Sequence, residues 1–285
     1  EKGLYTFTFE DVVCESCTFI FSKQRQLEED VNDYYEFYHS HSSSTSDEEH
    51  NARYEYLKNY IEDKAVGYEL GGGSNSSFSR FLKSNDINVT NIEVTDHWPS
   101  AEVVDFVICY YVLEHINDLS VFFANVNELL RVGGFFIFEV PDFYKNPGAS
   151  LNEEHVNHFN LTSVSSIAHR FGFELVSDSF GQGSRSFGSV VTLKKSYNYE
   201  NLSSIGMPQK FDIKEFERVS FDIQQAGSHY KRCIEHRKRL ISDIGSVCRS
   251  AKLKNKKVLI WGCNQNFIRL LSTLNTLNVL YDVVD

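Results

Sequence analysis

The chain has 285 residues, 41% of them hydrophobic, and a formal net charge of −11 at pH 7. This length suits one large or two modest globular domains. Because Lys and Arg cluster only between Arg232 and Arg239, the acidic balance argues against nucleic acid as a partner. No apolar stretch approaches the roughly 20 residues that span a bilayer, and no secretory leader is visible, so we expect a cytoplasmic protein without a membrane partner.

The N-terminal residues 1–33 predict a small β-rich head. Its apolar residues alternate around Cys14 and Cys17, and a strand is expected over residues 18–22. The two cysteines have the spacing of metal ligands. The other four are scattered, which is typical of a protein in a reducing compartment, and we expect them to be buried like small hydrophobic residues. Since the chain starts at Glu1 and stops at Asp285 on an apolar run, we expect a longer parent protein.

Residues 34–64 form an aromatic and serine-rich segment, and helical spacing at Tyr54, Leu57 and Ile61 predicts a helix. From residue 65 to residue 200, short apolar strands alternate with helices, which is typical of a parallel α/β sheet. We expect strands over residues 66–70, 89–94, 105–110, 135–140 and 174–177, an antiparallel edge strand over 189–194, and helices over 76–83, 119–132 and 163–171. The pair Gly133-Gly134 is expected to end the second helix.

Two further parts are expected beyond this sheet. Apolar residues recur at three-four spacing between Phe211 and Ala251, which predicts a long linking helix within residues 201–254. Residues 255–285 predict the first β-α-β of a second Rossmann-like unit, with strands over 257–261 and 279–284 and a helix over 266–274.

The first predicted strand of the sheet leads into Gly71, Gly72 and Gly73 and then into a helix. Glycine lets the backbone bend sharply and approach a ligand closely. A dinucleotide-binding turn needs a further glycine where Ser76 stands, so the pattern favours a ligand without phosphates. Glu93, at the end of the next strand, is placed to hold the two hydroxyls of a ribose. The turn therefore predicts an adenosine-type cofactor; the alternative is an ordinary tight turn.

Three motifs in this order carry a family resemblance: Glu69-Leu-Gly-Gly-Gly73, the run from Asp105 to Asp118 with its Glu-His pair, and Leu130 to Asp142. Residues 65–195 resemble the class I S-adenosylmethionine (SAM)-dependent methyltransferases, which have a Rossmann-like α/β fold. The resemblance implies SAM as cofactor, bound by Glu69, Gly71, Gly72, Gly73, Glu93, Tyr110, Tyr111, Glu114 and His115. For Glu114 and His115 the alternative role is to cap the following helix.

Flanking segments resemble the sugar C-methyltransferases, which act on nucleotide-linked keto-deoxysugars and consist of a zinc module, a SAM domain and a Rossmann-like domain. The features that carry this likeness are Cys14 with Cys17, the stretch from Tyr38 to His50, Glu154-His155-Val-Asn-His158-Phe159, the run from Gly183, and the C-terminal unit. The likeness implies a nucleotide-linked sugar as substrate, a catalytic role for the Glu-His stretch, and zinc in a longer parent. A homo-oligomer is compatible with it.

Two features depart from the pattern. Asp105 follows Glu93 by only 12 positions, too few for the helix and third strand that the fold normally inserts. Either the sheet is abbreviated or residues are missing from the chain, and the family's adenine-contacting acidic residue is unassigned. The first Cys-x-x-Cys pair is also absent, so Cys14 and Cys17 lack the second pair that tetrahedral zinc needs.

Carbon methylation next to a ketone needs a base, and His155 oriented by Glu154 is the candidate, because its loop follows a strand where open α/β sheets place their sites. The alternative is that His155 caps or packs on the helix near Ser163. His158 is a second candidate, and the hydroxyl of Tyr38 could polarise a carbonyl unless, like most tyrosines of its segment, it packs.

The function expected from the sequence is thus SAM-dependent C-methylation of a nucleotide-linked keto-sugar. Methylation of oxygen or nitrogen on another small metabolite is the nearest rival. A nicotinamide-dependent sugar oxidoreductase is suggested by the terminal strand and Gly262 but opposed by Ser76. A non-catalytic nucleoside-binding module is the fourth reading, supported by the short segment after Glu93.

Overall fold

The computed structural model of the chain divides into two compact units. One comprises Phe9–Asp222, and the other comprises Glu1–Thr8 with Ile223–Asp285. The residues that the structure describes are 11–14, 17–23, 45–73, 75–94, 98–99, 103–143, 145, 155–182, 188–198, 258–261, 281–284 and scattered positions from 228 to 254.

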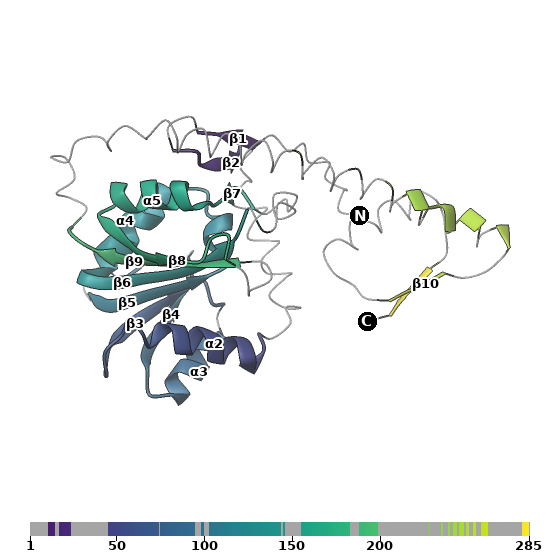
Figure 1. Ribbon diagram of the computed structural model, residues 1–285. Helices are drawn as coiled ribbons and strands as arrows, with labels where there is room; N and C mark the ends of the chain where they lie inside the picture. The colour runs from purple at the N-terminus through teal and green to yellow at the C-terminus, as the bar shows by residue number, and fades with distance from the viewer. Residues whose placement is uncertain are drawn as a thin grey trace. The chain divides into compact units, whose positions relative to one another are not determined.

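The unit Phe9–Asp222 is built on a six-stranded sheet (Figure 1). Its strands lie in the order β4 (Asn88–Ile92), β3 (Val66–Leu70), β5 (Val104–Tyr110), β6 (Leu130–Pro141), β9 (Gly188–Lys195) and β8 (Phe173–Asp178). The first four are parallel, and β9 runs antiparallel to both of its neighbours. The predicted α/β fold is confirmed, but β9 is not the edge strand, because β8 pairs along its outer side.

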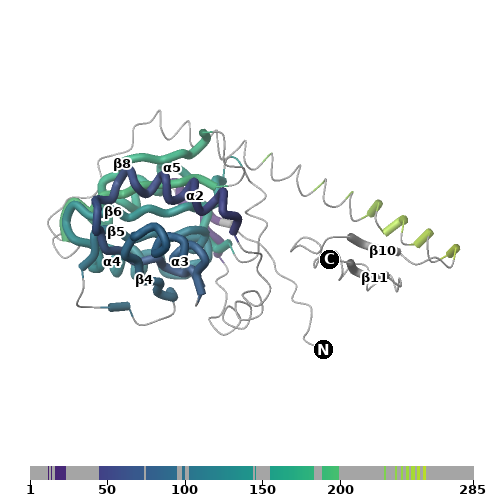
Figure 2. The backbone as a smooth tube through the Cα atoms, turned by 90° about the horizontal axis from the view of Figure 1, so that it is seen from below, coloured from purple at the N-terminus to yellow at the C-terminus, as the bar shows by residue number. Residues whose placement is uncertain are grey.

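Helices cover both faces of this sheet, as its buried strands require. Along β5, Val107 and Cys109 face one hydrophobic core, whereas Phe106 and Ile108 face the other. Helices α4 (Leu119–Leu129) and α5 (Leu161–Arg170) pack on the first core, and α2 (Asp47–Leu57) and α3 (Ser77–Ser84) pack on the second. Figure 1 shows the two pairs on opposite faces, and in Figure 2 α2 and α3 lie in front of the strands.

The boundary between α4 and β6 differs from the prediction. The helix ends at Leu129 rather than at residue 132, because Leu130 already pairs with Val104 of β5. The pair Gly133-Gly134 lies inside β6 instead of ending the helix. A Cβ on Gly134 would approach the carbonyl oxygen of Asp105 to 2.8 Å, so the glycine is needed for close strand packing.

The connection from β4 to β5 is short, as the spacing of Glu93 and Asp105 indicated. Among the described residues of this connection none forms a strand, and β4 is the edge of the sheet. Strand β4 ends at Ile92, two residues before its predicted end, because its partner β3 ends at Leu70 and turns into the glycines.

The N-terminal head contributes strands β1 (Asp11–Val13) and β2 (Ile20–Ser22). They form a small antiparallel sheet with β7 (Asn157–His158), in which Ile20 pairs with His158. The strand predicted from residue 18 starts later, because Thr18 has φ +57° in the turn that carries Cys14 and Cys17. The head is thus hydrogen-bonded to the segment that contains the candidate base.

In the other unit, β10 (Val258–Trp261) and β11 (Tyr281–Val284) pair in parallel, as predicted for a β-α-β unit. The helix predicted between them lies outside the described residues. Of the predicted long linking helix, the described positions from 228 to 253 are helical. Within the described part of the chain, no helix combines the length and apolarity needed to cross a bilayer.

Candidate active site

The glycine turn after β3 is fixed against the neighbouring strands. The Gly71 N–H donates to the Ile92 carbonyl oxygen at 2.9 Å, which continues the pairing of β3 with β4. Gly71 has φ +73°, and a Cβ there would lie 2.6 Å from Cγ2 of Val112. The turn therefore needs glycine for its conformation and because Val112, two residues after β5, lies directly against it.

Glu93 lies beside this turn, and its predicted ribose-binding role stays a prediction. The side-chain NH₂ of Asn91 donates to the Gly73 carbonyl oxygen at 2.7 Å and to Oε1 of Glu93 at 3.3 Å, so one amide joins the turn to the carboxylate. Oδ1 of Asn91 is buried and accepts no hydrogen bond from the described residues. The sequence did not identify Asn91, whose only signal is a polar residue near the end of a strand.

The carboxylate of Glu69, predicted to contact the cofactor, is 4% exposed. Its Oε2 accepts hydrogen bonds from the hydroxyls of Ser76, at 2.6 Å, and Ser79. Ser76 also caps α3 by accepting from the Ser79 N–H at 3.0 Å. Ser76, in place of a glycine, thus joins the strand before the turn to the helix after it. A cofactor contact of Glu69 stays a prediction.

Glu114, His115 and His155 come together beyond the same edge of the sheet. Ligand atoms from these three side chains all lie within 4.8 Å of one another, and the two imidazole rings meet edge to face with centroids 5.0 Å apart. Glu114 is 1% exposed. Burial raises the pKa of the Glu114 carboxyl to about 8, with a further contribution from the charge of Glu139.

Three hydrogen bonds hold the two segments of this cluster together. The Val156 N–H donates to the Glu114 carbonyl oxygen at 2.8 Å. The side-chain NH₂ of Asn157 donates to the carbonyl oxygens of Leu113, at 2.9 Å, and Ile116, at 2.7 Å. The segment that carries His155 is therefore attached to the 3₁₀ turn Leu113–His115, which places His155 beside Glu114 and His115. Asn157 was missed because its backbone partners are distant in sequence.

Tyr110 and Tyr111, predicted to bind the cofactor, contact a buried ion pair. Arg53 of α2 lies 3.3 Å from Oε2 of Glu139, and its guanidinium carbon is 4.3 Å from the centroid of the Tyr110 ring. The Tyr111 hydroxyl donates to Oε1 of Glu139 at 3.1 Å, and burial raises the pKa of this hydroxyl. The cofactor roles of both tyrosines stay predictions.

The remaining predicted site residues do not join the Glu114–His115–His155 cluster. His158 is 4% exposed, with its ring 5.9 Å from that of Phe143. Cys14 and Cys17 form no disulfide, and burial raises the pKa of Cys17 to about 11. Within the described residues, the three side chains that are close enough together to hold a metal ion include neither cysteine, so a zinc site at Cys14 and Cys17 has no support. Tyr38 and Glu154 lie outside the described residues.

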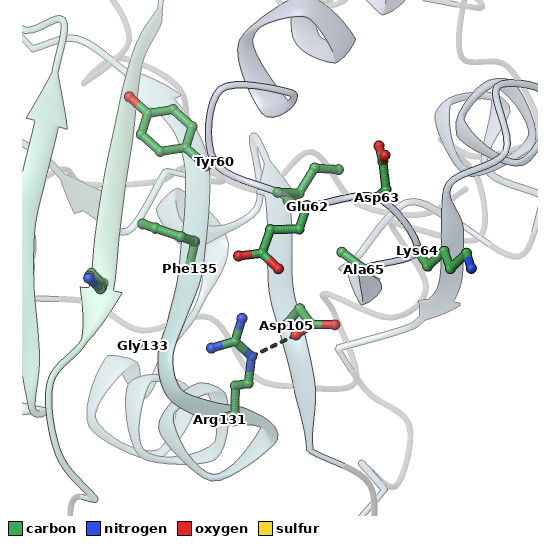
Figure 3. Close-up of a pocket in the computed structure, with 11 residues that line it drawn as sticks. Tyr60, Glu62, Asp63, Lys64, Ala65, Asp105, Arg131, Gly133 and Phe135 are labelled. Carbon is green, nitrogen blue, oxygen red and sulfur yellow. Dashed lines mark hydrogen bonds and ion pairs between the residues drawn. The ribbon is translucent and has the colours of Figure 1, made fainter.

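A separate hollow lies at the opposite, amino-terminal edge of the strands (Figure 3). It is lined by Glu62, Lys64, Ala65, Asp105 and Arg131, among others. Arg131 donates to Oδ1 of Asp105 at 2.6 Å, the interaction dashed in Figure 3. Because ligands of open α/β sheets bind at the carboxyl ends of the strands, this charged hollow is not the candidate active site.

Comparisons with known proteins match part of the chain. Residues 44–178 match the family model of a methyltransferase domain. No curated protein matches the chain.

Solved structures include similar SAM-dependent methyltransferases. One from Mesorhizobium loti is 14% identical over 50% of this chain and 97% of its own, with a TM-score of 0.40. One from Methanosarcina mazei is 13% identical over 50% of this chain and 97% of its own, with a TM-score of 0.35. Residues 44–178 thus match a methyltransferase domain, and they include the parallel strands of the sheet and the glycine turn.

Proposed function

We propose that the protein transfers the methyl group of SAM to a carbon next to the ketone of a nucleotide-linked sugar. The observation that carries this proposal is the position of His155. Its ring meets that of His115, and Glu114 is two residues from Val112, which contacts the glycine turn. A proton-accepting imidazole and the expected cofactor turn thus share one edge of the sheet. The keto-sugar itself is taken from the likeness of the segment at residues 154–159 to the sugar C-methyltransferases.

His155 takes the proton from the carbon next to the ketone, and the electron pair left behind makes an enolate. The bound cofactor supplies an electrophilic methyl group. The new carbon–carbon bond forms as the carbon–sulfur bond breaks, and the sulfur keeps the electron pair. Glu93 holds the ribose hydroxyls, and Gly71, Gly72 and Gly73 let the cofactor approach the backbone. The protein acts mainly by positioning the two reactants and by accepting one proton.

His155→Ala is expected to lower methyl transfer at least ~100-fold, since a positioned base contributes about that much or more. SAM affinity should stay within about threefold of the wild type, because the glycine turn and Glu93 are unchanged. Transfer is measured with labelled SAM and a panel of keto-sugar nucleotides, and affinity by calorimetry. The matched control is His169→Ala, an exposed histidine on α5.

Unchanged transfer in His155→Ala would remove His155 as the base. Transfer only to hydroxyl or amine acceptors in the same panel would replace carbon methylation by oxygen or nitrogen methylation. Binding of NAD in place of SAM would instead favour an oxidoreductase.

A further inference from the structure

We propose that Glu114, His115 and His155 form a binding site for one divalent transition-metal ion of the zinc type, and that the ion occupies the site in competition with the proton-accepting role of His155. The second part rests on the proposed function, whereas the first does not. No metal-ligand pattern in the sequence indicates this site, because His155 follows the adjacent Glu114 and His115 by about 40 residues.

The geometry of the three side chains carries the proposal. The ligand atoms of a tetrahedral zinc ion are separated by roughly 3.4 Å, as follows from bond lengths of about 2.1 Å. Here the three atoms lie within 4.8 Å of one another, and Nε2 of His115 is 3.9 Å from Oε1 of Glu114. Movements of about 1 Å or less in each side chain, within ordinary rotamer freedom, would close the triangle around an ion.

Burial supplies the second observation. Glu114 is 1% exposed, and its Oε2 accepts no hydrogen bond from the described part of the chain. A buried carboxyl group without a partner is costly to ionise, and a cation bound beside it would offset that cost. The side chain of His115 is 15% exposed, so water or a ligand can reach the site from that side. The site is therefore buried on its carboxylate side and open on its histidine side.

Hydrogen bonds to the backbone hold the segments of the Glu114–His115–His155 cluster in place before an ion binds. The hydrogen bonds from Val156 and from Asn157 fix the two ligand-bearing segments relative to each other. An ion that binds there needs to order only side chains, which lowers the cost of binding.

The donor set selects the metal. Two imidazoles and one carboxylate suit zinc, cobalt or iron, whereas magnesium and calcium prefer sets made of oxygen alone. With three protein ligands, a fourth position stays open to water.

The ion and the base compete for one nitrogen lone pair. An imidazole nitrogen that is bound to a metal cannot accept a proton from a substrate, because the same electron pair makes either bond. Metal binding is therefore expected to inhibit methyl transfer without affecting the glycine turn or Glu93.

The experiment titrates the full, chelator-treated chain with Zn²⁺ by calorimetry and with Co²⁺ by visible absorption. The chain carries Cys14→Ser and Cys17→Ser to remove thiolate ligands. We expect one ion per chain, d–d bands without thiolate charge transfer, and affinity at least tenfold weaker in Glu114→Gln and in His115→Ala. His169→Ala should bind as the parent does, and circular dichroism checks that each variant is folded. Methyl transfer is measured at the same ion concentrations.

Absence of binding up to millimolar Zn²⁺, or equal affinity in the parent and both ligand variants, overturns the metal site and leaves the proposed function intact. Binding at this site with undiminished transfer keeps the metal site and removes His155 as the base. Stimulation of transfer by the ion overturns the competition.

Discussion

At the scale of single residues, the glycine turn gives the sharpest prediction. A Cβ on Gly72 would lie 2.6 Å from Oδ1 of Asn91 and 2.9 Å from Cδ of Glu69. Gly72→Ala must push Asn91 away from Gly73 and Glu93, so we expect SAM affinity to fall at least tenfold, measured by calorimetry.

The matched control is Gly181→Ala. Gly181 has φ +71° but no atom within 4 Å of an added Cβ. This variant should lose about 1 kcal/mol of stability from its left-handed backbone and keep its SAM affinity. Wild-type SAM binding by Gly72→Ala would show that the turn does not hold the cofactor.

The sequence was informative about residues with strong local signals. The three glycines, Glu93 and the Glu114-His115 pair follow strand ends, and the fold places them at one edge of the sheet. Asn91 and Arg53 were not predicted, because their importance comes from partners distant in sequence or from contacts around the turn. No local pattern reveals that a helix preceding the sheet delivers a guanidinium to Glu139.

At the scale of elements, Asp105 ties three strands together at the amino-terminal edge. It accepts from the Val66 N–H of β3 at 2.9 Å and from Arg131 of β6 at 2.6 Å. These hydrogen bonds, that of Val66 first, lower the pKa of the Asp105 carboxyl. Because the pKa of Asp105 is lower in the folded state than in the unfolded state, ionised Asp105 stabilises the fold at any pH above the unfolded pKa of about 4. This stabilisation is lost as the pH falls through the pKa of the folded state.

Asp105→Asn keeps the acceptor for Val66 but removes the charge. We expect its free energy of unfolding at pH 7 to be lower by about 1 kcal/mol, with the difference from wild type shrinking below pH 4. Urea denaturation at pH 7 and pH 3 measures the difference in unfolding free energy between variant and wild type, and Asp63→Asn, at an exposed position, is the control. A difference that is the same at both pH values would mean that the charge of Asp105 contributes nothing.

Asn157 joins β7 to the turn that carries Glu114. Asn157→Leu leaves the Leu113 and Ile116 carbonyl oxygens without their donor, so we expect a loss of about 2 kcal/mol in stability, read from urea denaturation. The release of His155 should lower kcat about tenfold or more while SAM affinity stays near wild type. Unchanged kcat in a destabilised variant would limit Asn157 to a structural role.

Elements with a clear period were predictable, and their boundaries were less so. All six strands of the sheet were expected, because short apolar runs alternate with helical stretches. The end of α4 was misplaced because Leu130 continues the apolar pattern of the helix and yet pairs with Val104, a contact that periodicity cannot show. Pairing of β2 with β7 was likewise invisible, since it joins residues far apart in the chain.

At the scale of the whole molecule, the proposed methyl transfer requires a SAM site at the carboxyl-terminal edge of the sheet. The parallel strands β3, β4 and β5 end there with the glycine turn, Glu93 and the Glu114–His115–His155 cluster. The fold class was predictable from the sequence, and so was the methyltransferase domain matched at residues 44–178, from three motifs in order. The substrate was not, because acceptor contacts depend on side chains brought together from separate segments.

Calorimetric titration of the full chain and of Glu93→Ala with SAM and with NAD tests this central claim most directly. We predict one SAM per wild-type chain, no heat from NAD, and SAM affinity at least tenfold weaker in Glu93→Ala, because the ribose hydroxyls lose their carboxylate acceptor. Equal SAM affinity in the two proteins, or binding of NAD alone, would contradict the account.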